Sequence, residues 1–548
     1  MSRGPDAPLE LVARGATADA IAAHVPGLVA DRFASRLFAK DATLWGEAAE
    51  DEAGKRLGWT GLHRTSRPLL GEIAALRSEL ADEGVDHVVL CGMGGSSLAP
   101  EVICATAGVE LTVLDSSDPG QVSSALEDRL DRTVVVVSSK SGSTVETDSQ
   151  RRAFVDALNR AGIDPTRRIV IVTDPGSPLD EQSRADGYRV VNADPEVGGR
   201  FSALTAFGLV PSGLAGADIE TLLDEADAVA DLLADDDEAN PALRLGAAMA
   251  GTSPLRDKLV IVDEGSGLVG FGDWAEQLVA ESTGKDGTGI LPVVVADGTD
   301  PEVAAQPGDV TVARLVADRD DEDEPVPAAD PASEVSVTGS LGAQMLLWEA
   351  ATAVAGRLLG INPFDQPDVE SAKVAARSML EGEPDSTPPT FVDGPVEVRV
   401  LGGDWADGAK TLAEAVDALF GRLDPEHGYV AIMAYLDRVR YADLADVRRP
   451  VAARTGRPTT FGWGPRFLHS TGQLHKGGPP VGVYLQVTGD SGVDLAVPGR
   501  DYTFGRLIAA QAAGDAQVLA EHGRPVLRVH LTDVPAGLDA LREALDAR

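Results

Sequence analysis

Hydroxyl side chains gather behind a run of valines in the first third of the chain. Residues 133–137 read TVVVV, which is typical of a buried strand, and residues 138–147 read SSKSGSTVET. Where a strand of a parallel sheet gives way to a helix, the free N–H groups of the helix point at whatever lies there. Hydroxyl groups in that loop add neutral donors, so the segment is suited to holding a phosphate.

Capping of the next helix would explain these hydroxyls more simply, but one N-cap residue is enough for that purpose. A second loop strengthens the phosphate interpretation. Residues 92–97 read GMGGSS after the apolar stretch HVVL; Gly94 and Gly95 let the backbone approach an anion closely, and Ser96 adds a hydroxyl. Tight packing alone would also explain glycines here. The loop lacks the third glycine of the dinucleotide fingerprint, so we expect no nicotinamide cofactor.

The elements that must position these loops follow an alternating pattern. Apolar stretches alternate with helical ones at residues 87–90, 111–114, 133–137, 168–173 and 188–191, then at 259–262, 290–295 and 309–316. This pattern is typical of parallel sheets covered by helices on both faces. We therefore predict an α/β fold with two doubly wound domains and mainly parallel sheets. The predicted boundaries are an N-terminal helical segment at 1–60, a first domain at 61–240 and a second at 241–385.

The last third of the chain continues the pattern. Further apolar stretches lie at residues 396–400, 429–435, 481–487 and 525–531. We predict that residues 386–548 form a C-terminal α/β extension, which is either a third unit or the completion of the second sheet. The acidic run at 318–325 and the proline-rich stretch at 381–395 are predicted to be exposed loops or linkers.

Size and charge narrow the class of protein. A chain of 548 residues exceeds the size of one efficient core, so two or three domains are expected. A formal net charge of -40 argues against a nucleic-acid partner. The two cysteines, Cys91 and Cys104, build no disulfide framework, which favours the reducing cytoplasm. No apolar run is long enough to span a membrane.

Three further segments carry chemically active residues in a distinctive order. They read VGGRFS at residues 197–202, AESTGK at 280–285 and QPDVESAK at 366–373. Together with GMGGSSLAPEV and SSKSGSTVET they resemble the segments of sugar isomerase (SIS) domains and, more narrowly, those of the glucose-6-phosphate isomerase family. All five occur in the family's order between residues 90 and 375.

The resemblance implies an aldose–ketose isomerase that opens a sugar ring and moves a proton through a cis-enediol. Glu281 would be the base that carries the proton between C2 and C1, a task for one carboxylate. Arg200 would stabilise the negative charge on the enediolate. Gln366 would line the pocket, and Lys373 would contact the sugar near its ring oxygen. The resemblance also implies that Ser96, Ser139, Ser141 and Thr144 would hold the phosphate, with Lys140 nearby.

The family also places a ring-opening histidine between its last two segments, and here the chain departs from it. Residues 282–372 contain no histidine. The later segment LHSTGQ, at residues 468–473, resembles the sequence around that histidine in short bacterial members. The longer stretch GPRFLHSTGQLHKGG resembles the isomerase half of transaldolase–isomerase fusion proteins. We predict that His469 opens the ring from this different place in the chain, with His475 as its rival.

Other functions share some of these features. A dual phosphoglucose/phosphomannose isomerase would use the same base and fold. A non-catalytic SIS regulator would keep the phosphate loops but has no need of Glu281, Arg200 and Lys373 together. A transaldolase, which the fusion resemblance also suggests, needs a (β/α)₈ barrel with a Schiff-base lysine, whereas this chain begins directly with isomerase-like sequence.

The resemblance also implies the partners of the protein. It implies a hexose phosphate substrate, no cofactor, a homodimer, and a place in glycolysis and gluconeogenesis. No HxH or HExxH segment occurs, and His469 and His475 have no carboxylate at ligand spacing, so no metal is expected.

Overall fold

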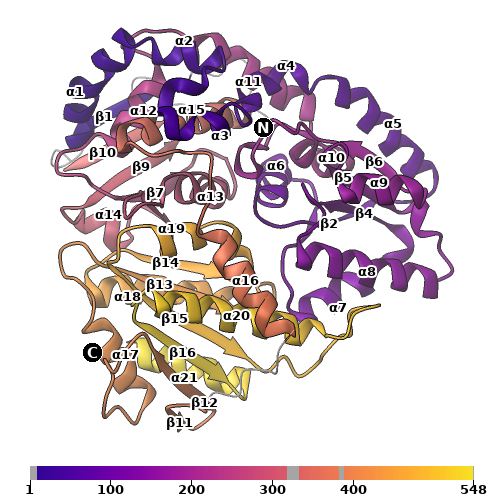
Figure 1. Cartoon of the computed structure of the whole chain (residues 1–548), viewed down its shortest axis with the longest axis vertical. Coiled ribbons are helices and arrows are strands. Elements are labelled where there is room, and N and C mark those ends of the chain that lie inside the picture. Colours follow the sequence, from indigo (N-terminus) through magenta and orange to yellow (C-terminus); the bar gives the residue numbers. More distant parts are fainter. Residues whose placement is uncertain (1–8, 318–331, 382–387, 547–548) are drawn as a thin grey trace.

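Three sheets organise the chain (Figure 1). The computed structural model describes residues 9–317, 332–381 and 388–546, and in helix α16 (Val369–Glu381) it describes side chains only for residues 374–380. Each sheet is mainly parallel and is flanked by helices, so the predicted α/β class is confirmed. The predicted acidic loop at 318–325 lies outside the described residues.

The first sheet has the strand order β3-β2-β4-β5-β6, with every pair parallel. Its strands are β2 His87–Cys91, β3 Thr112–Leu114, β4 Thr133–Ser138, β5 Ile169–Thr173 and β6 Arg189–Asn192. Its helices are α5 Pro68–Asp82, α6 Leu98–Ala107, α7 Pro119–Glu127, α8 Val145–Arg160, α9 Pro178–Ala185 and α10 Ala206–Ala215. Because β2 and β4 are parallel neighbours, the loops that follow them leave the carboxyl edge of the sheet side by side.

The second sheet has the order β1-β10-β9-β7-β8. Its parallel strands are β7 Lys258–Glu264, β8 Leu291–Val295, β9 Val310–Val316 and β10 Ser333–Val337. Residues 11–15, expected to be helical, form the strand β1 (Leu11–Gly15) antiparallel to β10. Pairing there gives β10 a second neighbour and satisfies the backbone groups of the N-terminal segment.

Helices connect and cover the second sheet. They are α1 Ala16–Ala30, α2 Phe33–Phe38, α3 Glu50–Ala53, α4 Leu62–Thr65, α11 Ile219–Leu233, α12 Pro241–Ala250, α13 Phe271–Thr283, α14 Pro301–Ala305 and α15 Leu341–Leu359. Helix α15 is buried from Leu341 to Gly356, which makes it the central helix of the core shared with α12 and α13. Among the described residues, no helix combines the length and the apolar composition needed to cross a membrane.

The C-terminal strands form a sheet of their own, in the order β11-β12-β16-β15-β13-β14. They are β11 Phe391–Asp393, β12 Val396–Leu401, β13 Tyr429–Tyr435, β14 Thr459–Trp463, β15 Gly482–Gly489 and β16 Val526–Leu531. Its helices are α17 Leu412–Phe420, α18 Arg448–Thr455, α19 Gly472–Gly477, α20 Phe504–Glu521 and α21 Val534–Asp546. Since none of these strands pairs with the second sheet in the described parts of the chain, they build a third unit.

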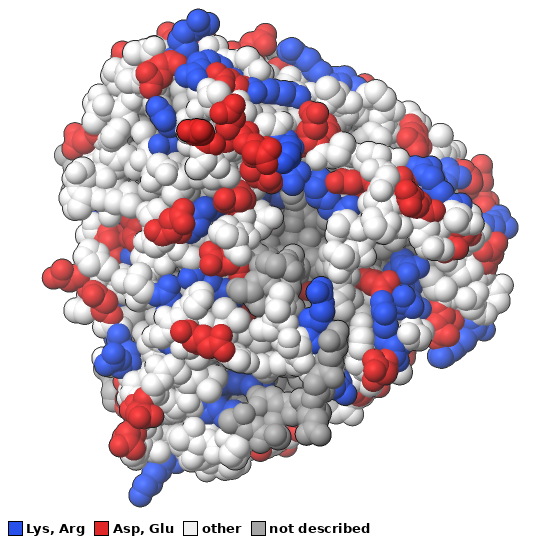
Figure 2. Space-filling view, viewed as in Figure 1, with Lys and Arg blue, Asp and Glu red and all other residues white. Residues whose placement is uncertain are grey.

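Apolar packing joins the third unit to the second. One cluster combines Val260 and Leu291 of the second sheet with Tyr429, Ala431 and Tyr484 of the third. Helix α16 leaves the second unit and packs along α20 of the third (Figure 1). Acidic and basic side chains are interspersed over the face shown in Figure 2. The units therefore share an apolar core, while this outer face carries charge of both signs.

Candidate active site

Two glycines bring three parts of the chain together at the carboxyl edge of the first sheet. Gly94 has a φ of +55° and begins the 3-10 turn Gly94–Ser96, in which Ser96 is half-buried. A Cβ on Gly95 would lie 1.9 Å from the carbonyl oxygen of Gly199. One on Gly94 would lie 2.9 Å from the carbonyl oxygen of His469. Glycine therefore lets the GMGGSS, GGRFS and LHSTGQ segments meet.

The hydroxyl loop follows β4, beside this turn. The buried Ser139 hydroxyl accepts a hydrogen bond from the Gly142 N–H at 3.1 Å and lies 3.4 Å from the Thr144 hydroxyl. The hydroxyls of Ser141 and Ser143 are hydrogen-bonded at 2.7 Å. Thr144 is the N-cap residue of α8, yet its side chain makes no capping hydrogen bond. Capping therefore does not account for this hydroxyl.

Lys140 is held by an acidic neighbour. Its Nζ lies 2.6 Å from a carboxylate oxygen of Asp174, after β5, and 3.4 Å from the carbonyl oxygen of Pro195, after β6. Burial raises the pKa of Asp174, and the hydrogen bond from Lys140 works in the opposite direction. The ammonium group thus faces the next two loops at the same edge of the sheet.

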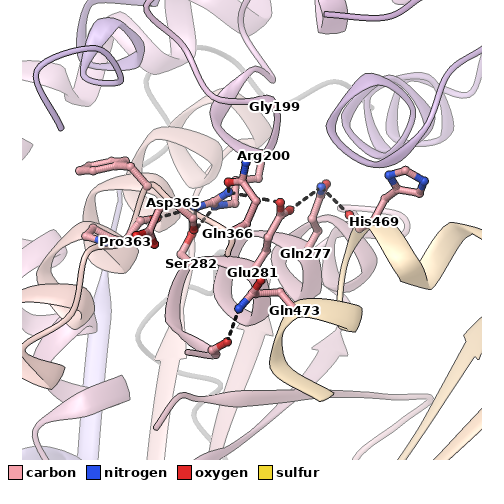
Figure 3. A network of polar contacts seen from close by, with 12 residues as sticks. Gly199, Arg200, Gln277, Glu281, Ser282, Pro363, Asp365, Gln366, His469 and Gln473 are labelled. Atoms are coloured by element: carbon pink, nitrogen blue, oxygen red, sulfur yellow. Dashed lines mark hydrogen bonds and ion pairs between the residues drawn. The ribbon is translucent and has the colours of Figure 1, made fainter. Parts of the chain in front are cut away.

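Arg200 is the centre of a buried polar network (Figure 3). Its Nε donates to the Ser282 hydroxyl at 2.8 Å, and its Nη1 donates to Oε1 of Gln366 at 2.8 Å. Its Nη2 donates to the carbonyl oxygens of Pro363 at 2.8 Å and Asp365 at 3.0 Å. Burial lowers the pKa of Arg200. The planar guanidinium is therefore fixed by acceptors on three sides.

Glu281 lies in the last turn of α13, with Oε1 3.3 Å from Nη1 of Arg200. Its other carboxylate oxygen accepts a hydrogen bond from Nε2 of Gln277 at 3.0 Å. The same Gln277 nitrogen donates to the carbonyl oxygen of His469 at 2.7 Å. The Glu281 side chain is 13% exposed, so its carboxylate is held at both oxygens and still reachable.

His469 enters this site from the third unit (Figure 3). It ends the 3-10 turn Arg466–His469, and its Nε2 lies 3.0 Å from Oε1 of Glu146. Glu146 belongs to the first turn of α8, directly behind the hydroxyl loop. The imidazole, 18% exposed, therefore lies close to the candidate phosphate site.

The rival histidine lies in an apolar core. His475 is buried among Tyr429, Phe467 and Tyr484, with ring centroids 6.2, 6.2 and 5.3 Å away. Neither of its ring nitrogens has a hydrogen-bond partner in the described part of the chain. Burial lowers the pKa of His475 to about 3. The geometry thus favours His469 as the histidine of the site.

Comparisons with known proteins agree with this arrangement. The family model described as phosphoglucose isomerase matches residues 75–249. A probable glucose-6-phosphate isomerase from Haloarcula marismortui is 32% identical over 343 residues, which cover 54% of this chain and 79% of the relative. A glucose-6-phosphate isomerase from Rubrobacter xylanophilus is 31% identical over 380 residues, which cover 58% of this chain and 87% of the relative. The chain belongs to the glucose-6-phosphate isomerase family.

A solved structure supports the fold of this family member. The crystal structure of a hypothetical protein from Thermus thermophilus has a TM-score of 0.57 and 28% identity. The superposition covers 68% of this chain and 100% of the Thermus thermophilus chain. The predicted family and fold class are therefore confirmed, whereas the roles of individual side chains stay predictions.

Lys285 is a family residue whose partners the sequence did not indicate. Its buried ammonium donates to the carbonyl oxygens of Asn362 at 2.7 Å and Asp365 at 2.6 Å, and to Oδ1 of Asp365 at 2.7 Å. Burial and the charge of Arg200 lower the pKa of Lys285 to about 8. By holding Asp365, Lys285 positions the adjacent Gln366.

Glu146 lies within the SSKSGSTVET segment, but the sequence pattern predicts no catalytic or binding role for it. Glu146 is 4% exposed, and its carboxylate contacts His469. An acidic residue in the first turn of a helix is ordinarily explained by the helix dipole. Nothing local therefore distinguishes it, and only the long-range contact shows that it belongs to the site.

The QPDVESAK segment connects this site to α16. The Asp368 N–H donates to Oε1 of Gln473 at 2.9 Å, and Nε2 of Gln473 donates to Oδ2 of Asp368 at 2.6 Å. Gln473 is the last residue of LHSTGQ, so the two segments are joined directly. The side chain of Lys373 lies outside the described residues, and its predicted contact with the sugar stays a prediction.

Within the described ranges, one group could offer three metal ligands: His87, Glu110 and Asp128. Both nitrogens of His87 already face threonine hydroxyls, at 2.8 and 2.9 Å. Arg129 forms ion pairs with both acids. The group also lies at the amino end of β2, opposite the phosphate loops. We therefore assign it no part in the chemistry.

Proposed function

We propose that the protein interconverts glucose 6-phosphate and fructose 6-phosphate by ring opening and proton transfer through a cis-enediol. The observation that carries the proposal is the Glu281 carboxylate held 3.3 Å from the buried Arg200, beside the phosphate loops and His469. A base, a cation and a ring-opening acid–base group are the three groups that this reaction needs.

Substrate binding would begin at the two loops of the first sheet. The hydroxyls of Ser139, Ser141 and Thr144, the first turn of α8 and the glycines at 94 and 95 offer uncharged donors to a phosphate. Ser96 adds a further hydroxyl, and Lys140 adds a positive charge nearby. This set of donors suits a chain with a net charge of -40, because few free cations are required.

Ring opening is assigned to His469. A carboxylate can only accept hydrogen bonds, so the contact with Glu146 places the imidazole proton on Nε2 and leaves Nδ1 for the sugar. Glu146 thereby orients the ring and stabilises its protonated form. His469 would take a proton from the sugar hydroxyl and pass one to the ring oxygen, where the resemblance also places Lys373.

Proton transfer is assigned to Glu281. The carboxylate would remove the proton from C2 and return it to C1, while Arg200 stabilises the charge that develops on the enediolate oxygen. Because Arg200 is fixed by four acceptors before substrate arrives, it need not reorganise during the reaction.

The family also suggests where and how the protein works. We propose a cytoplasmic enzyme, supported by two free, buried cysteines that fit a reducing compartment. A homodimer is proposed on the family resemblance alone. His469 lies in the same chain as Glu281, so under this proposal no second subunit is needed to supply the ring-opening histidine.

The test measures NADPH formation from fructose 6-phosphate with coupled glucose-6-phosphate dehydrogenase and EDTA. We expect activity in the wild type and a loss of about 10²–10⁴-fold in Glu281→Gln, because the base is removed. Glu276→Gln, on the same helix, is the control. Burial and the charge of Asp273 raise the pKa of Glu276 to about 8, so glutamine resembles its neutral form. Binding of fructose 6-phosphate without turnover by the wild type would indicate a sugar-phosphate sensor instead.

A further inference from the structure

The third unit contributes a second residue to the neighbourhood of the active site. Gln511 lies in α20 and is 3% exposed. Its Nε2 donates to Oε1 of Glu146 at 2.7 Å. Its Oε1 accepts a hydrogen bond from the hydroxyl of Ser117 at 2.5 Å. Both ends of the buried amide are therefore satisfied by residues of the first unit.

The two partners fix the orientation of this amide. A carboxylate has no hydrogen to donate, so only the NH₂ end of Gln511 can face Glu146. The Ser117 hydroxyl then donates to the amide oxygen. Oε1 of Glu146 accepts the hydrogen bond from the Gln511 amide. The same oxygen also lies 3.0 Å from Nε2 of His469. A chain of contacts thus runs from Ser117 through Gln511 and Glu146 to the imidazole.

We propose that Gln511 is a positioning residue for the ring-opening histidine. It donates to the Glu146 carboxylate, which favours the ionised form of that carboxylate and fixes its rotation. Glu146 in turn fixes the tautomer and the angle of the His469 ring. This inference rests on the proposed isomerase function, and Gln511 acts through Glu146 rather than on the sugar.

The hydrogen bond from Gln511 to Glu146 is important because Glu146 is buried. Glu146 is 4% exposed, so water cannot replace a lost donor freely. Without Gln511, Oε1 of Glu146 keeps His469 but loses the amide donor, so the carboxylate either turns toward another partner or takes up a proton more readily, and a protonated carboxyl no longer supports an imidazolium. Either response would loosen His469 while leaving Glu281 and Arg200 untouched, since neither contacts Gln511.

The experiment separates ring opening from proton transfer. Ring opening is followed by NMR exchange between the anomers of fructose 6-phosphate, and isomerisation by the coupled assay. We expect Gln511→Met to slow ring opening by about 10-fold, the lower end of the loss that follows removal of an outer hydrogen bond around a metal-bound histidine. Gln511→Glu should be slower still, because it sets a second carboxylate against Glu146. Equal effects of methionine and glutamate would contradict a role for the amide N–H.

A matched control tests for simple loss of packing. Gln486 is also buried, and its Nε2 donates to the backbone oxygen of Ala512 in the same helix at 2.9 Å, without contacting Glu146. We expect Gln486→Met to lower the melting temperature but to retain ring opening at the wild-type rate. An equal slowing in Gln486→Met and Gln511→Met would overturn the proposal.

A double-mutant cycle with His469→Ala decides whether Gln511 acts through the histidine. We expect Gln511→Met to cause no further loss once the imidazole is gone. An undiminished effect in the His469→Ala background would refute the proposal. A wild type without isomerase activity would instead refute the proposed function; the ¹⁵N shifts of His469 then still test the contact, since Gln511→Met should change the Nε2–H signal and Gln486→Met should not.

Discussion

Replacement of Arg200 tests the reaction most directly. Arg200→Met puts a shorter, uncharged side chain in place of the arginine and removes the cation that lies 3.3 Å from Glu281. It also leaves the Ser282 hydroxyl and the carbonyl oxygens of Pro363 and Asp365 without this donor. Arg200→Lys restores a charge, but as a point donor that cannot reach all of these acceptors.

The lost charge lowers kcat, and the lost hydrogen bonds lower the folding free energy, each by its own amount. Loss of one preorganised group that stabilises a developing oxyanion costs about 10²–10³-fold in kcat, or about 3–4 kcal/mol. We therefore expect Arg200→Met to lower kcat by this factor and to change KM for fructose 6-phosphate little. Each buried acceptor left without a partner costs about 1–3 kcal/mol of folding free energy. Arg200→Lys should fall between wild type and methionine in both measurements.

The assay pairs kcat with thermal unfolding, and Arg448→Met is the control. Arg448 is another buried arginine, with Asp300 at 2.5 Å and Glu302 at 2.6 Å, in the contact between the second and third units. Its loss should lower the melting temperature without lowering kcat of the folded fraction. A folded Arg200→Met enzyme with kcat within about tenfold of wild type would refute the assignment of Arg200 to the enediolate.

Buried charges support three further predictions. Burial raises the pKa of Glu349 well above its ordinary value, so the folded chain holds a proton there that the unfolded chain loses above about pH 4.5. Glu349→Gln should therefore stabilise the protein, and the gain in urea unfolding should grow as pH rises from 5 to 8; a pH-independent gain would contradict this. The pKa of His475 is lowered to about 3, so its cost to stability appears as pH falls below about 6.5. His475→Phe should raise the melting temperature at pH 5 more than at pH 8 and should leave kcat unchanged, whereas a lost activity would restore His475 as the ring-opening group. Arg466→Met removes ion pairs at 2.5 Å to Glu101 and 2.7 Å to Asp115, and should destabilise the chain by about 3–5 kcal/mol. Arg466→Met should also slow anomer exchange more than deuterium exchange at C2 of the open-chain sugar, because Arg466 begins the turn that carries His469. Equal slowing of both reactions would show that other contacts position the turn.

Local patterns were sufficient for the first sheet and its loops and for three of the five strands of the second sheet, but not for residues 11–15 and 333–337. The buried strand at residues 133–138 is apolar from Val134 to Val137, and the glycines and hydroxyls that follow such runs mark the carboxyl edge. The strand at residues 11–15 was missed because five residues carry little periodicity, and its pairing with residues 333–337 is a contact across the whole domain. For the same reason four of the six strands of the third sheet could be recognised but not assigned to a sheet, and residues 391–393 and 459–463 were not recognised as strands.

The candidate site was predictable only in part. Family segments located Glu281, Arg200 and Gln366, and the structure brings these three together. The parts that escaped prediction are partners: Glu146 for His469, and Asp365 for Lys285. Such partners lie hundreds or tens of residues apart in sequence, and a glutamate or lysine has the same local signal whether it is buried in a pair or solvated.

The junction between the second and third units has a consequence for assembly. His469 reaches Glu146 from a unit that shares an apolar cluster with the second sheet, including Val260 and Tyr429. A covalent tether of this kind presents a group at an effective concentration in the millimolar range. Cutting the chain between these units would turn delivery of the histidine into a bimolecular event, held only by the shared apolar surface. On the proposed mechanism, two separately produced fragments should then recover ring opening in a concentration-dependent manner, because one fragment supplies the histidine and the other the rest of the site.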